Sequence, residues 1–71
     1  MNQDKKNKII NSLKTGRMLG AGQSLNVLAH VSKSWNEEVS KYLQYLKQKG
    51  FVMYFADTGV WYLTKEIKEV E

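Results

Sequence analysis

The chain has 71 residues, a formal net charge of +4, a single histidine and no cysteine. Its length suits one small domain, and the missing cysteines and lone histidine exclude a disulfide framework or a structural zinc site. No apolar run approaches the roughly 18 residues of a membrane span, and no signal peptide is evident. We therefore expect one cytoplasmic domain over residues 1–71, with flexible ends at about 1–4 and 66–71 and no cofactor.

The charge is unevenly distributed along the chain. Residues 5–49 carry nine Lys or Arg against two Glu, a net charge of +7, whereas residues 50–71 carry two Lys against four acidic residues, a net charge of −2. A basic surface attracts phosphate backbones through counterion release. The alternative interpretation is an ordinary solvated lysine-rich surface.

The first predicted helix spans residues 4 to 15, with Asp4 at its N-terminus as a cap or dipole partner. Its apolar face is formed by Ile9, Ile10 and Leu13. Gly16 is expected to end this helix, because glycine readily takes the left-handed conformation that follows many helices. A loop should then run to Gln23, with room for a short extended piece at residues 18–19.

Two further helices are predicted in close succession. The second begins after Ser24 as N-cap, and its apolar positions are Leu25, Leu28, Ala29 and Val31. The third begins at Ser34, which has the capping-box spacing to Glu37, and ends at Gly50. Its apolar positions are Val39, Tyr42, Leu43 and Leu46. Two helices separated by a break of three to four residues are typical of a helix-turn-helix.

The pattern changes from helix to strand after Gly50. Residues 51–55 and 60–64 are rich in β-branched and aromatic side chains and flank a turn at 56–59, which predicts a hairpin. If Phe55 pairs with Val60, the face that carries Trp61 and Leu63 should pack on the helices, although a one-residue slip would reverse the faces. The expected fold is α+β, a winged helix-turn-helix of three helices followed by a two-stranded β-hairpin wing, and a charged tail that is frayed or weakly helical.

The third helix is the candidate DNA-reading element, because the second helix of a helix-turn-helix enters the major groove with its N-terminal residues against the bases. Gln44 could make a bidentate contact to adenine, and Glu37 could accept from a cytosine amino group. The candidate DNA-binding residues are Lys33, Asn36, Glu37, Ser40, Lys41, Gln44, Lys47, Lys14 and Arg17. The alternative is an amphipathic helix whose polar face is merely solvated.

The hairpin is an unusual wing, since residues 50–64 contain no Lys or Arg. We expect several of its aromatic side chains to be exposed, with Tyr54, Phe55 and Tyr62 as candidate contacts for a protein partner. The alternative is that these rings complete a small core, which is more plausible for Trp61. No carboxylate pair, Ser-His-Asp set or cysteine nucleophile is present, so we expect no enzyme.

Two segments resemble a known family. VSKYLQYLKQKGFV at residues 39–52, followed by GVWYL at 59–63, is similar to the PapI/FaeA-like proteins, the small winged-helix regulators of fimbrial operons. The resemblance runs from about Lys6 to Thr64. It implies a transcriptional coregulator that acts with the leucine-responsive regulatory protein at a fimbrial promoter, near methylated GATC-containing sites. The glycine-rich segment after the first helix and the short, non-basic hairpin loop depart from the family and weaken the expectation of wing–DNA contact.

Three functions stay open on the sequence. The first is a sequence-specific regulator of double-stranded DNA, monomeric or weakly homodimeric, whose affinity depends on a partner protein. The second is a self-sufficient repressor of phage or plasmid type that binds a palindromic site tightly. The third is a winged helix used only for protein–protein contact.

Overall fold

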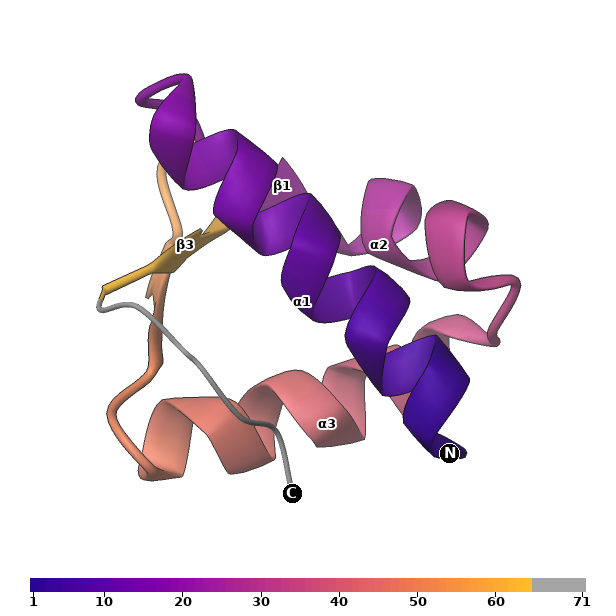
Figure 1. Cartoon of the computed structure of the whole chain (residues 1–71). Helices are drawn as coiled ribbons and strands as arrows, with labels where there is room; N and C mark the ends of the chain where they lie inside the picture. The colour runs from indigo at the N-terminus through magenta and orange to yellow at the C-terminus, as the bar shows by residue number, and fades with distance from the viewer. Residues whose placement is uncertain (65–71) are drawn as a thin grey trace.

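The computed structural model describes residues 1–64 and contains three helices and a three-stranded antiparallel sheet (Figure 1). Their order is α1 (Gln3–Met18), β1 (Gln23–Ser24), α2 (Leu25–Ser32), α3 (Asn36–Gln48), β2 (Val52–Phe55) and β3 (Val60–Leu63). The predicted α+β class and the three helices are confirmed. The predicted charged tail and the flexible end at 66–71 lie outside the described residues.

Helix α1 begins one residue before its predicted start. Asn2 is the N-cap, and its side chain accepts a hydrogen bond from the Lys5 N–H at 2.9 Å. Asp4 therefore lies in the first turn instead of at the cap, where it also pairs with Lys8 at 3.4 Å. An acidic side chain in this turn interacts favourably with the positive end of the helix dipole, as expected.

The predicted end of α1 at Gly16 is wrong, because the helix continues to Met18. The left-handed residue is Gly20, with φ 73°, one helical turn later. The Gly20 N–H donates to the Arg17 carbonyl and the Ala21 N–H to the Gly16 carbonyl, the bonding pattern of a Schellman motif. Gly16 is buried, and a Cβ there would lie 2.7 Å from the Ala21 carbonyl oxygen. This glycine thus permits close backbone approach and does not end the helix.

The wing was predicted as two strands, and the structure adds a third. Strand β1 pairs antiparallel with β3, with Gln23 opposite Trp61 and Ser24 opposite Val60, so the sheet order is β1-β3-β2. The extended piece predicted at 18–19 is also wrong, since Met18 is helical. A two-residue strand is too short to show an alternating pattern, and only its pairing with a distant strand defines it.

Helix α2 begins as predicted, because the Val27 N–H donates to the Ser24 hydroxyl at 3.2 Å. Of its predicted apolar positions Leu28 and Ala29 are buried and Leu25 packs beside them, but Val31 is 38% exposed.

The capping box predicted for α3 is wrong. Trp35 is the N-cap, without a side-chain cap bond, and the Ser34 hydroxyl donates to the Ser32 carbonyl instead.

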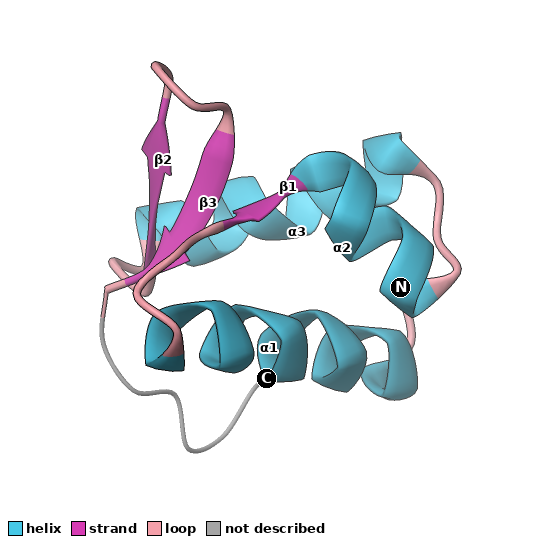
Figure 2. Cartoon of the chain, turned by 90° about the horizontal axis from the view of Figure 1, so that it is seen from above, coloured by secondary structure: helices cyan, strands magenta, loops and turns pink. Residues whose placement is uncertain are grey.

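Of the registers that the sequence left open, the hairpin has the one with Phe55 opposite Val60 and Val52 opposite Leu63. Trp61 and Leu63 are buried, which confirms that their face packs on the helices. Figure 2 shows the sheet at one end of the helices, with the tip of the hairpin projecting away from them. Gly50, at φ 83°, ends α3 as predicted.

One apolar core joins all three helices to β2 and β3. Its buried residues are Ile9, Ile10, Leu13, Leu28, Ala29, Val39, Tyr42, Leu43, Leu46, Val52, Trp61 and Leu63. Between residues 1 and 64, no helix combines the length and the apolar character needed to cross a membrane.

Candidate nucleic-acid interface

Helix α3 has two distinct faces. Val39, Tyr42, Leu43 and Leu46 are all buried, as the sequence pattern predicted. On the opposite side lie the exposed side chains of Glu37, Lys41, Gln44 and Gln48, which we call the outer stripe. Their spacing of four, three and four residues aligns them along one face of a helix. No outer-stripe side chain forms a hydrogen bond or ion pair with another residue in the described part of the chain, so all four can meet a ligand.

The turn before α3 holds the helix against α2. Residues 33–35 separate the two helices, and Lys33 adopts the left-handed conformation at φ 53°. The Lys33 N–H donates to the His30 carbonyl and the Ser34 N–H to the Ala29 carbonyl, so α2 also ends in a Schellman pattern. The Asn36 side-chain amide donates to the Asn26 side-chain oxygen at 3.2 Å, which ties the start of α3 to α2.

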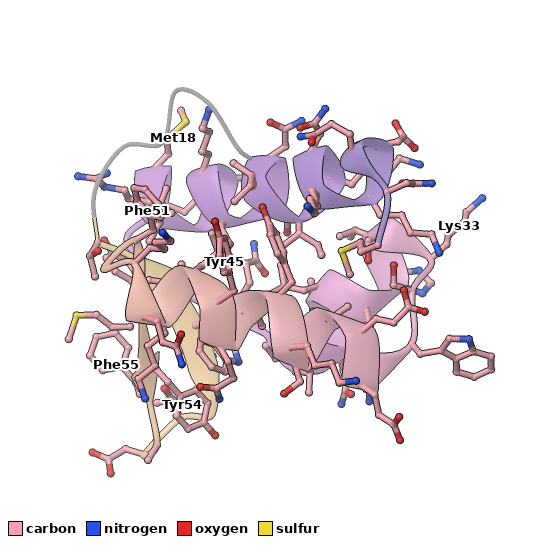
Figure 3. All side chains as sticks on the ribbon, turned by 90° about the horizontal axis from the view of Figure 1, so that it is seen from below. Met18, Lys33, Tyr45, Phe51, Tyr54 and Phe55 are labelled. Atoms are coloured by element: carbon pink, nitrogen blue, oxygen red, sulfur yellow. The ribbon has the colours of Figure 1, made fainter. Side chains whose placement is uncertain are left out.

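The predicted DNA-binding residues fall into two groups. Glu37, Lys41 and Gln44 belong to the outer stripe, and the exposed Lys47, the half-buried Ser40, the amide-bonded Asn36 and the exposed Lys33 border it. Figure 3 looks onto α3, with Lys33 at one end of the view and Tyr54 and Phe55 at the other.

Lys14 and Arg17 form the second group. They line a shallow depression with Met18 and Leu63. Lys14 and Arg17 belong to the C-terminal part of α1, and Figure 1 shows this end of the helix on the opposite side of the molecule from α3. The structure therefore does not bring these two residues to the face of α3.

The charges at the start of α3 nearly cancel. Glu37 and Glu38 lie in its first turn, and Lys33 and Lys41 flank them in the sequence. The two acids suit the positive end of the helix dipole, but they reduce the attraction of this end for phosphate. Basic residues return at Lys47 and Lys49, in the last turn and at the C-cap.

Tyrosine rings lie along the side of α3 that faces α1. The rings of Tyr42 and Tyr45 stack with centroids 6.3 Å apart, and the Lys6 and Lys49 ammonium groups lie 5.6 Å from the Tyr42 and Tyr45 centroids, respectively. Burial raises the pKa of Tyr42 to about 12, with a smaller contribution from Tyr45. The Tyr42 hydroxyl is buried and has no hydrogen-bond partner within residues 1–64. Tyr42 is thus a neutral core residue at physiological pH.

The predicted partner-binding aromatics do not share one face of the sheet. Tyr54 is 44% exposed, and its ring lies 4.8 Å from that of the buried Trp61. Phe55 is 42% exposed and packs edge-on against the half-buried Tyr62 on the other face, at 6.1 Å. Phe55 and Tyr62 line a shallow depression with Val60, Thr58 and the loop at 20–22. The sequence could not show that this loop lies beside the hairpin, because β1 was not predicted.

Trp35 was not among the predicted site residues. Its side chain is 78% exposed, and together with Ser34, Asn36 and Glu37 it lines a shallow depression at the start of α3. Its position between two polar residues at the start of the predicted third helix was the available sequence signal. Ser34 was instead interpreted as the helix cap, so the tryptophan was left without a role.

Searches for similar proteins found no matching family model, no matching curated protein and no matching solved structure.

Proposed function

We propose that this chain is a sequence-specific DNA-binding transcriptional regulator with a winged helix-turn-helix fold, in which α3 enters the major groove. The observation that carries this proposal is the outer stripe of α3, whose polar side chains are exposed and unpaired within residues 1–64. The three-residue turn between α2 and α3 and the pairing of β1 with β3 beside the hairpin support the winged helix-turn-helix assignment.

Each group on α3 has a defined role in this proposal. Gln44 makes a bidentate contact to an adenine, and Glu37 accepts a hydrogen bond from a cytosine amino group. Lys41 contacts a base edge or a phosphate, while Lys33 and Lys47 contact phosphates on either side of the groove. Lys14 and Arg17 are left out of this interface, because they lie at the far end of α1.

The proposed affinity is modest, and a partner protein is part of the function. Two acids lie in the first turn of α3, and residues 50–64 provide no cation for a wing contact to phosphate. The resemblance to PapI/FaeA-like proteins supports a coregulator of a fimbrial operon that acts with the leucine-responsive regulatory protein. Phe55 and Tyr62 offer that partner an aromatic contact on the outer face of the hairpin.

A salt titration of binding to random duplex DNA tests the proposal. The wild-type protein should bind weakly at about 50 mM salt and lose affinity as salt rises. Lys41→Glu should abolish binding, because it places a third acid on the groove-facing end of α3. Arg17→Glu is the matched control, since it makes the same charge change at an exposed site outside the face, and it should retain most of the binding.

If the wild-type protein binds random duplex DNA and Lys41→Glu does not, the specific site can be selected from a pool of random duplexes. The selection is carried out with and without a partner protein. Lys41→Ala and Gln44→Ala should then abolish binding to the selected site and leave the circular-dichroism spectrum unchanged. Tight binding to a palindromic site by the protein alone would favour the self-sufficient repressor instead. Absence of binding at about 50 mM salt would refute the DNA-binding proposal.

The second candidate function is protein–protein contact alone, and the exposed Phe55 beside Tyr62 favours it. In that case Lys41→Glu leaves function intact, whereas Phe55→Ser or Tyr62→Ser destroys it. The two candidates therefore predict opposite responses to the same pair of variants.

A further inference from the structure

Trp35 has a position that neither capping nor packing explains. It is the N-cap of α3, a position that favours Ser, Thr, Asp or Asn, yet its side chain makes no cap bond. Its indole is 78% exposed and contacts no aromatic ring or cation within residues 1–64. The other tryptophan, Trp61, is 5% exposed and belongs to the core.

We infer that Trp35 is a DNA-contacting residue, which packs its ring on a deoxyribose and donates its indole N–H to a phosphate oxygen at the edge of the groove. This inference rests on the proposed entry of α3 into the major groove. Trp35 lies two residues before Glu37, where the outer stripe begins, and two residues after the exposed Lys33. The indole nitrogen is a donor only, which matches a phosphate oxygen, an acceptor only.

The local charges explain why an aromatic contact is needed here. Lys33 and Lys41 are balanced by Glu37 and Glu38, so this end of α3 gains little from Coulomb attraction to the DNA backbone. An uncharged ring gains affinity from contact with the sugar and a hydrogen bond to phosphate, and it releases no counterion. The surrounding Ser34 and Asn36 keep the site polar, as expected at the rim of a nucleic-acid interface.

This role predicts a distinctive effect on binding. Trp35→Ala should weaken binding to random and selected duplexes by about tenfold in both cases, because a backbone contact carries no sequence information. The slope of log affinity against log salt should stay unchanged, whereas Lys47→Ala, which removes a proposed phosphate contact, should reduce it by about 1. Trp35→Phe, which retains a ring but not the N–H, should lose less affinity than Trp35→Ala. Met18→Ala is the control, since Met18 is apolar and 87% exposed but lies at the end of α1.

Tryptophan fluorescence gives an independent readout on the intact chain. Iodide should quench Trp35 but not the buried Trp61, and saturating duplex DNA should remove the iodide-sensitive component. Trp35→Phe isolates the Trp61 signal, which DNA should leave unchanged. Because only the exposed residue is replaced, the difference between wild type and Trp35→Phe does not depend on a variant of the core.

The outcomes separate this inference from the proposal on which it rests. Equal affinities of wild type and Trp35→Ala, with Trp35 still open to iodide on DNA and Lys41→Glu still inactive, would overturn the inference alone. Loss of a protein partner in Trp35→Ala, with DNA affinity intact, would also overturn it and assign Trp35 to that partner. Absence of any DNA binding by the wild type would overturn both.

Discussion

The hydroxyl of Tyr42 is buried and has no hydrogen-bond partner among residues 1–64, while the Lys6 ammonium group of α1 lies over the ring. A buried, unsatisfied hydroxyl costs about 1–3 kcal/mol, and the phenyl ring alone would keep the packing and the cation–π contact. Tyr42→Phe should therefore raise the free energy of unfolding by about 1 kcal/mol in urea denaturation. A clear loss of stability would mean that the hydroxyl is satisfied in solution.

The same residue predicts a pH dependence. Burial raises the pKa of Tyr42 from 10.0 to about 12 in the folded protein. The folded protein therefore holds the phenol proton more strongly than the unfolded chain does. The contribution of this proton to the free energy of unfolding is complete below pH 10 and is lost between about pH 10 and 12. Melting temperatures followed over this range should fall less steeply for Tyr42→Phe than for the wild type. If the melting temperatures of the two proteins fall in parallel over this pH range, the raised pKa of Tyr42 is contradicted.

Lys33 carries backbone strain next to the proposed interface. It is the only non-glycine residue with positive φ in residues 1–64, and this conformation costs an ordinary residue about 1–2 kcal/mol. Lys33→Gly should therefore raise the free energy of unfolding by about 1 kcal/mol while weakening binding to duplex DNA through the lost cation. Lys33→Gln separates the two effects, because it removes the charge and keeps the strained conformation. A lower free energy of unfolding for Lys33→Gly would contradict the proposed backbone strain at Lys33.

Some features of the helices and strands can be predicted from short local sequence patterns, and others cannot. The apolar spacing of α3 and the Ser24 cap follow from short stretches of sequence, and the structure confirms both. The sequence left the hairpin register open, and the structure decides it. The end of α1 could not be predicted in this way, because Gly16 and Gly20 are both suitable and the choice depends on where the chain returns past Gly16.

The capping box was wrong for a related reason. Ser34 has the spacing required to cap α3, but its hydroxyl donates to the Ser32 carbonyl at the end of α2. The Schellman turn of α2 uses the Ser34 backbone N–H as well. In so short a turn, the end of one helix and the start of the next compete for the same residue.

Strand β1 depends on close contact with β3. A Cβ at Gly22 would lie 2.7 Å from the Val60 Cγ2 atom and 2.8 Å from the Trp61 carbonyl oxygen. Gly22→Ala should lower the free energy of unfolding by about 1–3 kcal/mol and speed hydrogen exchange at the β1–β3 pairing.

Gly20→Ala is the control for this variant. Its Cβ meets nothing within 4 Å, so its cost is the left-handed strain of about 1–2 kcal/mol, and the β1 and β3 amides should stay protected. Equal exchange in the two variants would show that the close approach at Gly22 is unimportant.

At the scale of the whole molecule, the outer face of α3 could be predicted from its sequence, whereas the surroundings of that face could not. The helical period alone separates Lys41 and Gln44 from the core. It carries no information on how α1 lies relative to α3, so it could not show that Lys14 and Arg17 lie away from the exposed face of α3. By contrast, alternation along the strands does predict that Tyr54 lies on the other face of the hairpin from Phe55 and Tyr62.

Backbone amide chemical-shift mapping with a short random duplex at about 50 mM salt tests the proposed interface most directly. The proposal predicts shifts concentrated at Glu37, Lys41 and Gln44 and in the turn at 33–35, with little change at Met18 and Leu63. Shifts confined to Phe55 and Tyr62, or no shifts at all, would contradict the central claim that the exposed face of α3 contacts DNA.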